Sequence, residues 1–308
     1  MKNFKNILIL LVAWIMIGCQ KEIEFNLPPV EQTLVVEGKI ETGVPPVVFI
    51  TNSQGYFDPI DSSTFNNIFV NDAQVTMFDG TTNHTLSVLS FGSASVYTSF
   101  DPATYGVDGK NYQLTVVHGN KTLTAQTQIP YAVPLDSLWF ELADASDPLD
   151  SLGFLWTKFT DPDSLGNCYR WFSKRINSYT YNYDPPYDNV IGQQKDSIYI
   201  APFGSATDDK FFNGLSFEFA VSRGEIGNFE GPDDEGPEEG YFKRGDTIAI
   251  KATSITYSTY LWVRSMEDQA FSTGSPFASP GNLPGNIEGD GIGIWAGYGV
   301  YLDTLICQ

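Results

Sequence analysis

Cysteine and histidine are rare in this chain of 308 residues, which contains three cysteines and two histidines. So few of either exclude a disulfide-rich scaffold and a zinc site built from paired cysteines and histidines. His84 and His118 lack the His-Glu-x-x-His spacing of a metalloprotease, so we expect both to be surface strand or turn residues. No Gly-x-Ser-x-Gly elbow positions a nucleophile. We therefore expect a protein that is not an enzyme, with no catalytic residue and no metal ligand set.

Basic residues are also scarce, since 17 Lys and Arg stand against 37 Asp and Glu, giving a formal net charge of −20. Such a surface repels phosphates and anionic lipid headgroups, so we expect no nucleic acid partner. Acidity also serves the solubility of exported proteins, and by itself it does not identify a cationic ligand.

Apolar runs are short. The run from residue 7 to residue 17 has eleven residues, whereas crossing a bilayer takes roughly 20. Lys2 and Lys5 precede it and Gly18 follows it, an order typical of a cleaved signal peptide. Met16-Ile17-Gly18-Cys19 resembles a lipobox, which implies that Cys19 carries the lipid. The alternative is an ordinary secretory signal with an incidental cysteine.

The residues after Cys19 indicate a destination. Gln20-Lys21-Glu22-Ile23-Glu24 resembles the acidic export signal of Bacteroidota lipoproteins, which implies that Lys21, Glu22 and Glu24 direct the protein to the cell surface. A solvated tether is the alternative interpretation. We thus expect residues 1–18 to be a lipoprotein signal peptide, residues 19–32 a tether, and the protein to be lipid-anchored in the outer membrane and exposed on the cell.

Short alternating runs separated by turn residues predict an all-β fold. Seven strands between residues 34 and 127, with hairpin turns at Asp79-Gly80 and at residues 118–121, predict an N-terminal sandwich over residues 33–130. It resembles prealbumin-like, carboxypeptidase-regulatory-like or immunoglobulin-like sandwiches. Pro130 and Pro134 predict a short stiff linker, so residues 134–308 form a second, larger β-rich domain.

Six strands and one helix are predicted in this second domain before residue 272. The strand candidates are residues 138–142, 153–159, 167–176, 196–201, 215–222 and 246–253. Trp262, Val263, Met266 and Ala270 have helical spacing, which predicts a helix over residues 256–271 capped by Ser254 or Thr256. Residues 291–305 return to strand, and the glycines of 289–293 indicate a tight turn rather than a phosphate loop, because no lysine accompanies them.

Three groups of residues are candidates for binding or bonding. Tyr179, Tyr181, Tyr183 and Tyr187 offer aromatic surfaces for a sugar, a peptide or a partner protein, or else they cover their own sandwich. The acidic run at 230–239 and the Asp161-x-Asp163 pair could hold Ca²⁺, although both lack the EF-hand order and solvated loops are the alternative. Cys168 and Cys307 either form a disulfide or remain buried free thiols.

The chain resembles one family over nearly its whole length. The matching elements are Val35–Gly38, Asp161-Pro162 followed by Asn167-Cys168-Tyr169, and the stretch Leu283-Pro284-Gly285-Asn286 to Tyr298. They are similar to the Bacteroidota lipoproteins called domain of unknown function 4249, from which Asp290 and Ile294 depart slightly. The resemblance implies outer-membrane lipoproteins, often encoded beside TonB-dependent receptors, with no established reaction.

Three functions follow from these patterns. The first is a non-enzymatic accessory lipoprotein that binds a ligand or an outer-membrane receptor and serves TonB-dependent uptake. The second is a structural or assembly lipoprotein of the outer membrane. The third is a glycoside or peptide hydrolase, because abundant carboxylates could pair across a cleft that sequence does not reveal.

Replacing Cys19 with Ser removes the thiol that lipid attachment needs, so the Cys19→Ser protein should lose membrane retention. Fractionation of cells followed by immunoblotting measures this directly. Unchanged recovery with outer membranes would contradict the lipoprotein interpretation.

Overall fold

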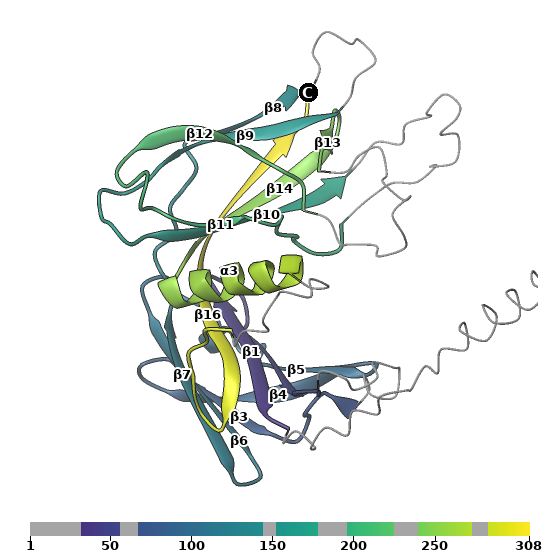
Figure 1. The fold of residues 1–308 in the computed structure, drawn as a ribbon, viewed down its shortest axis with the longest axis vertical. Helices are drawn as coiled ribbons and strands as arrows, with labels where there is room; N and C mark the ends of the chain where they lie inside the picture. Colours follow the sequence, from purple (N-terminus) through teal and green to yellow (C-terminus); the bar gives the residue numbers. More distant parts are fainter. Residues whose placement is uncertain (1–31, 56–66, 144–151, 178–195, 225–239, 273–282) are drawn as a thin grey trace, which may run out of the picture. The chain divides into compact units, whose positions relative to one another are not determined.

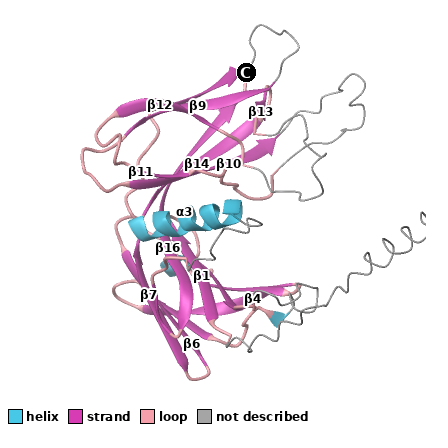
Figure 2. Cartoon of the chain, in the orientation of Figure 1, coloured by secondary structure: helices cyan, strands magenta, loops and turns pink. Residues whose placement is uncertain are grey.

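The computed structural model describes residues 32–55, 67–143, 152–177, 196–224, 240–272 and 283–308. Residues 32–308 form one compact unit. Its described residues form mostly strands with one long helix, which confirms the predicted all-β, sandwich-like fold (Figure 2). In the described ranges, no helix has the length and apolarity needed to span a membrane.

The seven strands expected between residues 34 and 127 are present. They are β1 (Leu34–Glu41), β2 (Val47–Asn52), β3 (Gln74–Phe78), β4 (Asn83–Phe91), β5 (Ala94–Thr98), β6 (Asn111–His118) and β7 (Lys121–Gln128). Gly80, with φ 95°, lies in the β3–β4 connection, and Gly119, with φ 60°, lies in the β6–β7 connection. Both glycines adopt the left-handed backbone that tight hairpins require, so the two predicted hairpins are confirmed.

The last strands of the chain complete this first core. Neighbouring strands follow the order β16-β1-β2-β5-β4-β3-β6-β7-β15, in which β15 (Ile287–Gly289) and β16 (Gly291–Ile306) are separated only by Asp290. β1 runs parallel to β16, and the other neighbours in this path are antiparallel. Since β15 and β16 are consecutive, the path returns to its starting point and the strands wrap around one core.

Trp295 of β16 lies at the centre of that core. Its side chain is 0% exposed, and its Nε1 donates a hydrogen bond to the carbonyl of Tyr112 at 3.2 Å. A Cβ added to Gly38 would lie 2.6 Å from the Trp295 ring, so β1 needs glycine where the ring crosses it. The early Val-Val-Glu-Gly strand and the late glycine-rich strand thus fit together through this one ring.

A second core lies between two further groups of strands. One group contains β8 (Ser137–Leu142), β9 (Leu152–Thr160), β12 (Ser216–Val221) and β13 (Phe242–Lys243). The other contains β10 (Cys168–Asn177), β11 (Ala206–Asp208), β14 (Thr247–Ile255) and the end of β16. Apolar side chains from both groups, including Leu155, Phe159, Trp171, Ile248 and Ile250, form one buried cluster.

A buried ion pair lies among the strands around the second core. Nε of Arg175 on β10 is 2.9 Å from Oδ2 of Asp246, and the two side chains are 2% and 0% exposed. The backbone carbonyl of Asp246 accepts a hydrogen bond from the N–H of Cys307 at 2.9 Å. Asp246 therefore connects the start of β14 both to β10 and to the end of the chain. Removing one member of such a pair would leave an uncompensated buried charge.

β16 belongs to both halves. Residues 291–298 pair with β1, and residues 298–306 pair with β14, as the yellow strand in Figure 1 shows. The predicted boundary at residues 130–134 falls between β7 and β8, but the sheet continues past it through β16. Two separately folding domains remain a prediction, and the first of them would need residues from the end of the chain.

Helix α3 (Tyr257–Ser272) confirms the predicted helix and its cap. Oγ1 of Thr256 accepts a hydrogen bond from the N–H of Thr259 at 3.3 Å. The buried face differs from the predicted one: Trp262 and Val263 are buried, but Met266 is 40% exposed and Glu267 is 4% exposed. The helix is rotated because the Glu267 carboxylate accepts the backbone N–H of Gly204 at 3.2 Å, which satisfies it in a buried position.

The strand expected at residues 196–201 is wrong. In this segment Ile200 forms only an isolated bridge with Ser173. The segment borders β10 beyond the end of β11, where Ser173 and Ile200 exchange two backbone hydrogen bonds of 2.9 Å and the N–H of Asp196 donates to the carbonyl of Arg175 at 3.0 Å, but no continuous ladder forms. The short strands β11, β13 and β15 were not expected, because two or three residues carry no periodicity.

Replacing Trp295 with Ala should lower the free energy of unfolding by about 3–5 kcal/mol, the usual cost of removing a large buried ring. Urea denaturation of the purified protein measures it. Leu302→Ala, at a side chain 57% exposed on the same strand, is the control and should change stability by about 0.5 kcal/mol or less. Equal effects would contradict closure of the first core by β16.

Candidate functional site

Several residues singled out by sequence lie outside the described residues. They are Cys19, Lys21, Glu22, Glu24, Tyr179, Tyr181, Tyr183, Tyr187 and the acidic run at 230–239. Lipid attachment, surface export, partner binding by these tyrosines and calcium binding by the acidic run therefore remain predictions.

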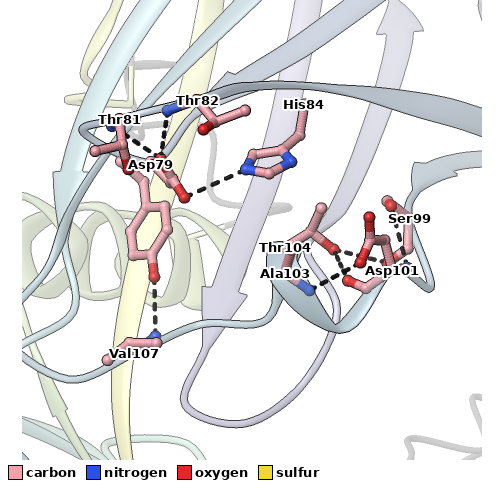
Figure 3. A network of polar contacts seen from close by, with 10 residues as sticks. Asp79, Thr81, Thr82, His84, Ser99, Asp101, Ala103, Thr104 and Val107 are labelled. Atoms are coloured by element: carbon pink, nitrogen blue, oxygen red, sulfur yellow. Dashed lines mark hydrogen bonds and ion pairs between the residues drawn. The ribbon is translucent and has the colours of Figure 1, made fainter.

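His84 lies beside a turn in which a carboxylate binds backbone. Oδ1 of Asp79 accepts the N–H groups of Thr81 at 2.9 Å and of Thr82 at 2.8 Å, and Oδ2 lies 3.2 Å from Nε2 of His84 (Figure 3). These hydrogen bonds, led by the one from Thr82, hold the pKa of Asp79 below its usual range. The arrangement stabilises the β3–β4 hairpin and is a structural site.

A similar turn lies nearby in Figure 3. Oδ1 of Asp101 accepts the N–H of Ala103 at 3.0 Å, and the hydroxyl of Thr104 donates to the carbonyl of Asp101 at 2.7 Å. The second histidine, His118, lies at the end of β6 with Nε2 3.1 Å from Asp72. Both histidines thus lie on strands of the first half, each beside one aspartate.

Asp161 is a buried structural carboxylate. It is 2% exposed, accepts the hydroxyl of Tyr169 at 2.5 Å through Oδ1, and accepts the N–H of Gly214 at 3.0 Å through Oδ2. This explains the spacing of the Asp-Pro and Asn-x-Tyr elements, since Asp161 directly follows β9 and Tyr169 is the second residue of β10. Within the described ranges, no three His, Cys, Asp or Glu side chains gather as a metal site would require.

Cys168 and Cys307 are free and buried. They pack in different clusters, Cys168 beneath α3 and Cys307 in the second core. Burial raises the pKa of each thiol to about 12, so both are protonated at neutral pH and pack as small apolar side chains.

An aromatic pocket opens in the second half of the molecule, where β11 ends one sheet and β12 ends the other. Its volume is about 300 Å³. The lining residues are Phe159, Tyr169, Trp171, Pro202, Phe203, Gly204, Ser205, Thr207, Phe212, Phe217, Phe219, Ala220, Val221 and Ser222. None of these residues is of a type charged at neutral pH, and burial and the bond to Asp161 raise the pKa of Tyr169 further above its ordinary value.

The rings of the pocket wall support one another. The ring of Phe159 packs edge to face on Tyr169 and on Trp171, with 4.8 Å and 5.5 Å between ring centres. The ring centres of Trp171 and Phe219 are 4.9 Å apart. The ring centres of Phe217 and Phe212 are 4.8 Å apart. Edge-to-face pairs contribute about 0.5–1.5 kcal/mol each beyond area burial, so the wall is preformed rather than assembled by a ligand.

The opposite side of the pocket is the loop at residues 202–205. α3 positions this loop through the bond from the N–H of Gly204 to Glu267, and the ring of Phe203 packs 5.0 Å from that of Phe271 on the helix. Within the part of the chain that the structure describes, the hydroxyl of Ser205 is buried and has no hydrogen-bond partner. An unpaired buried hydroxyl destabilises the folded protein, and a hydrogen bond to a ligand or a water molecule removes this cost.

Sequence patterns reveal part of this pocket. The strand predicted at 215–222 is present as β12, and Phe217, Phe219 and Val221 alternate along it as its more buried side chains. Their facing partners come from β9 and β10 and from a loop, and that proximity is not readable from spacing along the chain.

A protein-family model described as domain of unknown function (DUF4249) matches residues 20–302. No curated protein matches the chain.

The charge of Asp79 should make the stability of the first half depend on pH. Because folding lowers the pKa of this carboxyl, its stabilising contribution is present above the ordinary Asp pKa of about 3.9 and is lost as pH falls below it. The protein should therefore be more stable than Asp79→Asn at pH 7, with the difference shrinking towards pH 3, as measured by urea denaturation. Asp290→Asn, at an exposed turn, is the control, and a difference for Asp79→Asn that is independent of pH would contradict the role of the charge.

Proposed function

We propose that this chain, which belongs to the family called domain of unknown function (DUF4249), is a lipid-anchored outer-membrane protein that binds a small uncharged ligand. Binding without chemical conversion, in the service of TonB-dependent uptake, is the function proposed. The aromatic pocket with the unpaired hydroxyl of Ser205 is the observation on which it rests.

The anchoring part of the proposal rests on the first 24 residues. A short apolar run, Gly18 and Cys19 support lipid attachment, and the charged residues Lys21, Glu22 and Glu24 support display on the cell surface. A tether places the pocket outside the bilayer, where it can meet ligands or a membrane receptor.

The binding part rests on the chemistry of the pocket. A volume of about 300 Å³ lies at the lower end of small-molecule sites. Flat rings on one wall favour a ring-shaped or apolar ligand, and Ser205 supplies one hydroxyl that can donate or accept a hydrogen bond. Charged ligands are disfavoured, because no lining side chain offsets the loss of their hydration.

Two pocket variants separate apolar contact from hydrogen bonding. We expect small ring compounds, tested as indole, phenol and methyl glucoside, to include a binder whose affinity falls about tenfold or more in Phe219→Ala. Ser205→Ala should weaken only compounds that bear a hydroxyl or N–H group, by about fivefold. Isothermal titration calorimetry measures both changes, and quenching of Trp fluorescence gives a second readout.

Phe91→Ala is the matched control, because Phe91 is 62% exposed on β4 and lies away from the pocket residues in sequence and sheet order. Affinity purification of the protein from native outer membranes, followed by mass spectrometry, tests the uptake role. Recovery of a TonB-dependent receptor would support it. Failure of every ring compound to bind, together with recovery of no receptor, would overturn the proposal.

A further inference from the structure

Three cations gather around one carboxylate on the sheet face opposite the aromatic pocket. Arg170 alternates with Tyr169 and Trp171 along β10, so it lies on the other face of that strand. Arg170 pairs with Thr253 on β14, and Lys251 lies on the same face of β14, two residues before Thr253. Lys39 and Glu41 come from β1, on the far side of β16.

Both oxygens of the Glu41 carboxylate already bind a lysine. Oε1 of Glu41 lies 2.8 Å from Nζ of Lys39, and Oε2 lies 3.0 Å from Nζ of Lys251. Each oxygen therefore has one ammonium partner. Among the described residues no carboxylate contacts Arg170, whose guanidinium donates a hydrogen bond to the hydroxyl of Tyr298 instead.

Aromatic rings are the other neighbours of the cations. The guanidinium of Arg170 lies 5.0 Å from the centre of the Phe172 ring, and Nζ of Lys251 lies 4.4 Å from the same centre and 5.2 Å from that of Tyr199. Cation–π contacts contribute about 0.5–2 kcal/mol and leave the charge itself uncompensated. Nε of Arg170 is buried and without a hydrogen-bond partner in the described part of the chain.

The charges also act on one another. Burial lowers the pKa of Lys251, Glu41 raises it, and Lys39 and Arg170 lower it further, which places Lys39 and Arg170 within interaction range of Lys251. Such an excess of positive charge is unusual in a protein with 37 acidic and 17 basic residues. Unpaired positive charges are unfavourable where they are partly buried, so the binding of an anion to such a cluster is favourable.

We propose that this cluster binds an oxyanion group, a phosphate or a carboxylate, at Arg170 and Lys39. A planar guanidinium binds either group through two parallel hydrogen bonds. The side chain of Lys39 is 48% exposed, so solvent reaches this end of the cluster. Its ammonium can therefore donate one N–H to a ligand while another stays bonded to Glu41. The proposal does not depend on the aromatic pocket, because the two sites lie on opposite faces of β10.

Titration of the purified full-length chain with inorganic phosphate and with acetate, at constant ionic strength set by chloride, tests this site. We expect saturable binding of at least one anion by calorimetry and a rise in melting temperature at saturation. Stronger binding of phosphate would assign a phosphate group, and stronger binding of acetate a carboxylate. Both results support an oxyanion site.

Arg170→Gln and Lys39→Gln should each weaken anion binding about tenfold, the effect of losing one charge-assisted contact. Lys158→Gln, at an exposed lysine on β9, removes the same charge from the other sheet and should leave binding unchanged. If Arg170→Gln fails to fold, the exposed Lys39 variant still decides the outcome. No saturable binding of either anion, or equal weakening by Lys158→Gln, would overturn the proposal.

Discussion

The backbone pairing of β16 with two different strands is the interaction on which the molecule depends. Its first half completes the ring of strands around Trp295, and its second half pairs with β14 at one end of the sheet that covers the second core. Tyr298 lies at the change-over and pairs with both Glu41 and Ile255. A strand that serves two cores makes their packing interdependent, whether or not each half can fold by itself.

β10 shows how one strand separates two chemistries. Tyr169 and Trp171 line the pocket on one face, while Arg170 and Phe172 belong to the cation cluster on the other. Further along, Arg175 returns to the inner face and is neutralised by Asp246. Period-two alternation therefore gives uncharged and charged groups separate environments within a few residues, without any intervening domain.

Sequence predicts the features that depend on neighbours along the chain. The Asp79-Gly80 hairpin and the Thr256 cap follow from residue types within a few positions, and the structure has both. The buried role of Glu267 and the lone bridge at Ile200 were missed, because each depends on a partner far away in sequence, Gly204 and Ser173. The pocket was missed for the same reason, since Phe159, Trp171 and Phe219 come from three strands and none is distinctive alone.

The late position of β16 in the chain has a kinetic consequence. Val36, Val48 and Leu114 are made early, but the ring that fills the space between them is residue 295. During synthesis, which proceeds from the N-terminus, the early strands have an open edge at β1 until residues 291–298 have been made. Pairings of such high sequence separation form slowly, so the edge of β1 stays open for a long interval, during which the repulsion between chains of net charge −20 opposes their association.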